Sequence, residues 1–163
     1  MSSHPALAVL LEKVPLAPLG PGSPMDAMRP ALEADDATLF GQVYPTTANA
    51  CRAGLWLAFG FLDESHAISQ GLHTREGSYW HALMHRREPD GTNAKYWFRK
   101  VGTHPIYAEL TKEAAELGWR SWAAAEFVDE CEKERGTGSE REALLRKVQL
   151  AEWLVLFGWC LKG

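Results

Sequence analysis

The 163-residue sequence has few cysteines and lacks a long apolar run. Cys51, Cys131 and Cys160 are odd in number and show no CxxC spacing, so neither a disulfide framework nor a zinc knuckle is indicated. We therefore expect a reducing, cytoplasmic location. The late apolar stretch 153–161 is too short to cross a bilayer. No lysine or arginine precedes the short apolar run 6–11, so we predict no signal peptide.

Positive charge is also in short supply. The chain has 17 Lys and Arg against 21 Asp and Glu, which gives a net charge of -4. A protein that binds nucleic acid or an anionic membrane usually carries a basic surplus, so we expect neither partner. A homodimer is left open. Hydrophobic residues make up 46% of the chain, enough for one domain to bury its own core.

Strand signals are absent as well, because the sequence shows no sustained alternation of period two and no Asn-Gly hairpin turn. Helical spacing recurs instead. It predicts helices over 47–70, 76–88, 93–100 and 105–117, one that opens at Ser121, and a last one that starts at a capping box of Ser139 and Glu142. The predicted fold class is therefore all-α, a helical bundle.

Proline is unevenly distributed, because six of the nine prolines fall between Pro5 and Pro30. The run 15–24 cannot continue a helix. We predict a proline-rich N-terminal arm over 1–30 and a single helical domain over 31–163. We expect the arm to lie across the domain as a strap. A proline-rich linker or partner-binding segment is the alternative.

Five of the six histidines lie within residues 63–104. At 100° per residue, His81, His85 and Glu88 share one stripe of their helix. Asp63 and His66 share one face of the preceding helix. If the two faces meet, imidazoles and carboxylates converge.

Such a ligand set suits a divalent transition metal, because imidazole and carboxylate are borderline donors. One hypothesis is therefore a metal-binding enzyme in which His81, His85 and Glu88 bind the ion together with Asp63 or His66. The spacing HxxxHxxE differs from the HExxH motif. The alternative interpretation is structural, with histidines that donate hydrogen bonds to carbonyl or carboxylate groups and line a solvent-filled groove.

Our first hypothesis is a small-molecule site for an anionic or hydroxyl-rich metabolite. Arg87 rises from the apolar face of its helix, where it must be paired, reach water or meet an anionic ligand. The candidate acid–base residues are His66, His81, His85 and Glu88, and the candidate ligand-binding residues are Arg87, Asn93, Tyr96, Arg99 and His104. These aromatic and cationic side chains can seat a planar or anionic group.

A third hypothesis is a protein-interaction module without catalytic activity. Trp119, Trp122 and Trp159 would then form an exposed patch with the proline arm.

Four segments of the histidine region carry a resemblance. Residues 65–70, 79–90, 93–99 and 101–105 resemble a family of uncharacterised proteins that share the patterns SHxISQ, YWHALMHRREPD, NAKYWFR and VGxHP. The segments span about a quarter of the chain. The resemblance implies no activity, because a shared pattern without a known site carries no function.

Overall fold

The computed structural model describes residues 4–163, and within that range it contains ten α-helices, one short 3-10 helix and no β-strand. The all-α prediction is confirmed. Residues 1–3 of the predicted arm lie outside the described residues. Over the same range, every helix falls short of the length and apolar character needed to cross a membrane.

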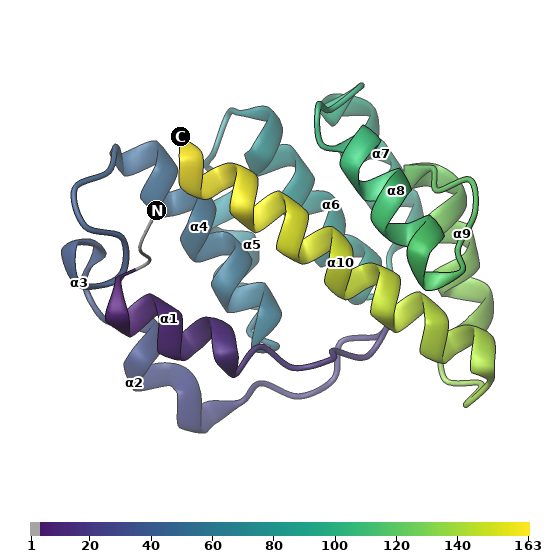
Figure 1. Cartoon of the computed structure of the whole chain (residues 1–163), viewed down its shortest axis with the longest axis horizontal. Coiled ribbons are helices and arrows are strands. Elements are labelled where there is room, and N and C mark those ends of the chain that lie inside the picture. The colour runs from purple at the N-terminus through teal and green to yellow at the C-terminus, as the bar shows by residue number, and fades with distance from the viewer. Residues whose placement is uncertain (1–3) are drawn as a thin grey trace.

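Most of the helices follow one another with short connections, and the exception is the proline-rich segment 13–25 between α1 and η1. In order they are α1 (Pro5–Glu12), η1 (Asp26–Met28), α2 (Arg29–Leu32), α3 (Asp36–Phe40), α4 (Pro45–Ala58), α5 (Leu62–Ser69), α6 (Arg75–Arg87), α7 (Gly91–Val101), α8 (Tyr107–Leu117), α9 (Ala124–Glu134) and α10 (Glu140–Lys162). The long C-terminal helix α10 runs diagonally across the other helices (Figure 1). It begins where predicted, because the Ser139 side chain accepts a hydrogen bond from the backbone N–H of Glu142.

The prediction of one helix over 47–70 was wrong, because the chain breaks between α4 and α5. Gly60 has a φ of +85°, and a Cβ atom there would lie 2.7 Å from the Ser23 carbonyl oxygen. The backbone N–H of Phe61 donates to the Trp56 carbonyl, which closes α4 with a left-handed glycine cap. Apolar residues continue across the break, so the pattern alone did not reveal it. The break places His66 on a separate helix.

The predicted start of a helix at Ser121 was also wrong. Ser121 adopts a φ of +64°, outside the helical region, and α9 begins at Ala124. Helix α4 begins at Pro45, slightly before the expected Thr46 or Thr47, because proline is well suited to the first helical turn.

Helix α6 is central to the larger hydrophobic core. Trp80 is fully buried, and its ring lies against Gly54 where α6 passes α4. The Trp153 Nε1–H of α10 donates to the Gly54 carbonyl at 2.8 Å. These contacts hold α6 and α10 against α4, and they restrict the positions that His81 and His85 can take.

A buried ion pair also joins α6 to α10. Arg86 Nη2 lies 2.6 Å from Glu152 Oε2, and the Tyr79 hydroxyl donates to Glu152 Oε1 at 2.9 Å. Both charged side chains are at most 1% exposed. Burial is the largest single effect and lowers the pKa of Arg86. The charge of Glu152, the hydrogen bond to it and smaller effects of neighbouring groups together outweigh burial, so the pKa lies above its ordinary value.

The proline-rich segment between α1 and η1 extends toward α9 and the first half of α10 and then returns (Figure 1). Its carbonyl groups have no helix or sheet partner, so side chains of the helices must supply the donors. The donors are Arg146 to Leu16 and Ala17, Gln149 to Pro18, Arg135 to Leu19, and Arg87 to Gly20 and Pro21. These bonds tie residues 16–21 to three helices.

Candidate metal centre

Three histidines from two helices meet beside α7. His66 comes from α5, and His81 and His85 come from successive turns of α6. One ring nitrogen from each lies within 4.8 Å of the other two. Since His81 and His85 are four residues apart, their rings stack at 4.8 Å between centroids. The His66 ring approaches them edge-on at 4.7 and 5.3 Å.

His81 is the most enclosed ligand candidate. Its ring is 4% exposed, and the Trp97 indole of α7 stacks on it with ring centroids 3.9 Å apart. Its Nδ1 is buried and has no hydrogen-bond partner among the described residues. Burial, together with the neighbouring His85 and His66, lowers the pKa of His81 to about 4. The ring is therefore neutral at pH 7, the state in which imidazole binds metal.

His85 is oriented by a carboxylate. Its Nδ1 lies 2.9 Å from Glu88 Oε1, one residue past the end of α6. This bond leaves His85 Nε2 available on the opposite side of the ring. A carboxylate that holds the far nitrogen of a ligand histidine is a common support of metal sites. Glu88 therefore lies beside His85, and with His85 and Asp90 it forms a second group of side chains that could hold a metal ion.

The cluster has the composition of an open metal site. Three imidazole nitrogens would supply three of the four ligands that a zinc ion prefers, and one position would be left for water or substrate. His81 and His85 are buried, while His66 is only half-buried. Access from solvent is therefore on the His66 side.

Two of the predicted residues lie apart from this cluster. Asp63 is exposed and belongs to neither group of metal-capable side chains found in residues 4–163. Arg87 donates to the carbonyls of Gly20 at 2.7 Å, Pro21 at 3.2 Å and Leu57 at 3.4 Å. Burial lowers the pKa of Arg87 to about 10, helped by the charge of Arg86. In this arrangement Arg87 anchors the proline-rich segment.

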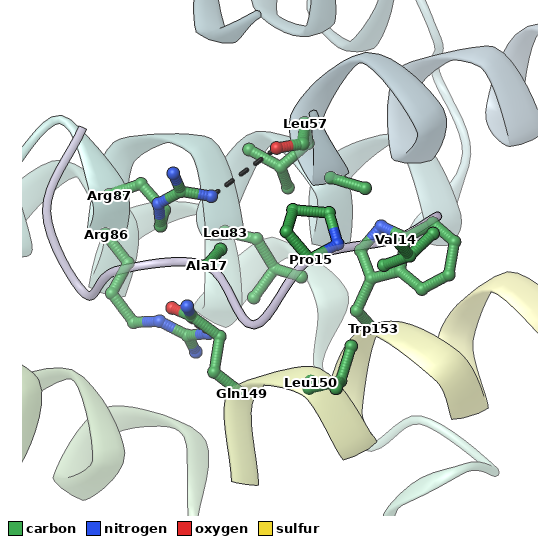
Figure 2. A pocket seen from close by; sticks show the side chains of 11 residues that line it. Val14, Pro15, Ala17, Leu57, Leu83, Arg86, Arg87, Gln149, Leu150 and Trp153 are labelled. Atoms are coloured by element: carbon green, nitrogen blue, oxygen red, sulfur yellow. Dashed lines mark hydrogen bonds between the residues drawn. The ribbon is translucent and has the colours of Figure 1, made fainter. Parts of the chain in front are cut away.

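Arg87 and Arg86 border a small cavity beneath that segment. Figure 2 shows both arginines and Gln149 at one end of it, with Pro15 and Trp153 toward the other. Its volume of about 30 Å³ is about that of one water molecule. It is therefore too small for a metabolite.

His104 is also separate from the cluster, and both of its ring nitrogens are paired. Nε2 lies 3.2 Å from Glu76 Oε1, and Nδ1 accepts from the Ile106 N–H at 3.2 Å. The same Glu76 oxygen accepts from Trp159 Nε1. The His104 bond lowers the pKa of Glu76 to about 2. These contacts give His104 a structural position.

The remaining predicted ligand-binding residues gather on α7. Asn93, Tyr96 and Arg99 line a shallow groove together with Asp90 and Thr92. Trp97, on the same helix, was not among the predicted site residues. It follows Ala94 by three residues and directly precedes Phe98, and this helical spacing of apolar residues is the sequence signal that could have placed it at the edge of the buried face of α7.

The predicted patch of exposed tryptophans was wrong. Trp122 is 6% exposed and packs against Tyr107 and Phe127. Trp119 is half-buried against Phe127, whereas Trp159 lies beside His104. The three rings therefore form no common exposed surface.

No family model, curated protein or solved structure matches this chain. The basis for a function is therefore the arrangement of its own side chains, above all the three histidines.

Proposed function

We propose that the protein binds one divalent transition metal ion, best matched by zinc, through His66, His81 and His85. The observation that carries the proposal is the meeting of three ring nitrogens within 4.8 Å. One of these rings has a buried nitrogen without a protein partner among the described residues. A buried polar atom of this kind normally has a partner, and a metal ion would provide one.

The charge state of His81 favours coordination of a metal over general acid catalysis by this ring. A histidine that transfers protons near neutral pH works best with a pKa close to 7. The pKa of His81 is about 4, so the ring is neutral at pH 7 and cannot act there as an imidazolium acid. A neutral imidazole retains its lone pair for coordination.

Three protein ligands and a free fourth position are typical of catalytic zinc sites, in which the ion activates water or polarises a substrate oxygen. We therefore propose a metal-dependent hydrolytic or hydration activity on a small molecule. The residues of this chain would bind the ion, orient His85 through Glu88 and shield His81 with Trp97.

We expect the purified protein, prepared without chelators and without a polyhistidine tag, to contain about one zinc ion per chain by elemental analysis. His81→Ala should weaken zinc binding at least ~100-fold, because one of only three protein ligands is lost. Competition with a chromophoric chelator measures the affinity. Circular dichroism verifies that the helices persist.

His73→Ala is the matched control, because His73 is exposed and lies outside the cluster. It should bind zinc as the wild type does. Equal zinc affinities of wild type and His81→Ala would rule out the site.

A second prediction separates an orienting Glu88 from a direct ligand. If Glu88 acts through His85, Glu88→Gln should retain one zinc per chain with an affinity roughly 10- to 100-fold lower. Glu116→Gln removes an exposed carboxylate of α8 and should leave the affinity unchanged. X-ray absorption should show the same three nitrogen ligands in wild type and Glu88→Gln. If the spectrum of the variant instead lacks an oxygen ligand that the wild type has, Glu88 binds the ion directly.

A further inference from the structure

The groove on α7 adjoins the three-histidine cluster. It has a volume of about 350 Å³ and is lined by Asp90, Thr92, Asn93, Tyr96 and Arg99. At one end, Asp90 offers a carboxylate oxygen within 4.8 Å of ligand atoms of His85 and Glu88. The Asp90 end of the groove therefore lies on the Glu88 side of His85.

The other end of the groove carries positive charge that is free to bind a ligand. Within residues 4–163, neither Arg99 nor Lys100 forms an ion pair. Lys95 on the same helix, by contrast, is paired with Asp129 of α9. An arginine fork without a protein partner can bind a carboxylate or phosphate through two parallel hydrogen bonds.

Tyr96 holds this charge at the groove. Its ring is 43% exposed, and the Arg99 guanidinium and the Lys100 ammonium lie 5.9 and 5.6 Å from its centre. Cations at this distance are attracted to the ring face. The Asn93 amide, one turn earlier on α7, adds a hydrogen-bond donor in the same groove.

The two ends of the groove have opposite charge, which gives a bound molecule a direction. At the end nearest His85, Asp90 accepts from the Asn93 backbone and side-chain N–H groups at 3.1 and 3.4 Å. A second anion would be repelled there. An anionic group is stabilised only at the Arg99 end.

We propose that this groove binds a small molecule through its carboxylate or phosphate group. Arg99 makes the charged contact. The Asn93 amide, which already donates to Asp90, lies beside the uncharged part of the molecule. This contact does not depend on the proposed metal.

The test uses metal-free, ¹⁵N-labelled protein titrated separately with inorganic phosphate and with acetate. We expect the Arg99 Nε–H and Asn93 amide signals to shift with saturation for at least one anion, and the tighter one identifies the chemical group. Arg99→Gln should weaken that binding at least ~10-fold, because a charge-assisted bidentate contact is lost. Arg120→Gln removes the same charge from an exposed arginine elsewhere and should have no effect.

Two outcomes would contradict anion binding in the groove. In the first, the anion shifts NMR signals of other residues but not those of Asn93 and Arg99. In the second, Arg99→Gln and Arg120→Gln weaken anion binding equally. Zinc content of Arg99→Gln is measured in parallel and should equal that of the wild type. If the protein binds the anion but no zinc, the proposed metal site is wrong and the proposed anion-binding groove still stands.

Discussion

Glu152→Ala should lower the free energy of unfolding by about 3–5 kcal/mol, because it leaves Arg86 charged and without its carboxylate partner in the core. Arg86 is 1% exposed, so water cannot replace the lost carboxylate. The Tyr79 hydroxyl loses its acceptor as well. A loss of this size is a large fraction of the stability of a typical domain. Urea unfolding followed by circular dichroism measures it.

Removal of the whole polar network is the control for this prediction. The triple variant Tyr79→Phe, Arg86→Met, Glu152→Leu should recover most of the lost stability, because no buried charge remains unpaired. If Glu152→Ala unfolds within 1 kcal/mol of the wild type, the ion pair is not needed to hold α6 against α10.

Gly54→Ala should destabilise the fold by about 1–3 kcal/mol, although alanine is the better helix former. A Cβ atom at this position would lie 2.6 and 2.8 Å from the Trp80 ring carbons Cζ2 and Cη2. Trp80 is fully buried, so the ring cannot move away without displacing α6 from α4. The shift in the urea concentration at the midpoint of unfolding measures the effect, provided that both proteins have the same m value, the slope of the free energy of unfolding against urea concentration.

Gly158→Ala provides a matched comparison within α10. A Cβ atom there meets no heavy atom within 4 Å, so only helix propensity changes. We expect this variant to be more stable than the wild type by about 0.5–1 kcal/mol. Equal gains from both substitutions would contradict the close packing of Trp80 on Gly54.

Much of the part of the candidate site that lies on α6 could be predicted from the sequence. The four-residue spacing of His81 and His85 predicted that the rings share one face, and they stack. The predicted end of this helix at residue 88 lies one residue from its observed end at Arg87. These features depend on hydrogen bonds within single turns of helix, which local sequence controls.

Other features of the site depended on contacts between distant segments. The sequence offered both Asp63 and His66 on one helix face, and only the packing of α5 beside α6 brought His66 to the cluster and left Asp63 in solvent. Arg87 was compatible with three roles. Its position among carbonyl groups of Gly20, Pro21 and Leu57 was decided by the path of a segment more than 60 residues away.

The sequence by itself determined the all-α class, the limits of α6, α7 and α8 to within two residues, and the shared face of His81 and His85. Helical hydrogen bonds and the side-chain period act within a few residues, which is why these features could be predicted. Tertiary structure decided the break at Gly60, the approach of the third histidine, the cover by Trp97 and the position of His66 relative to Asp63. Each of these depends on which surfaces pack together. Packing depends on the shape and burial of residues that are far apart in the chain. A single sequence does not show which of these residues come into contact.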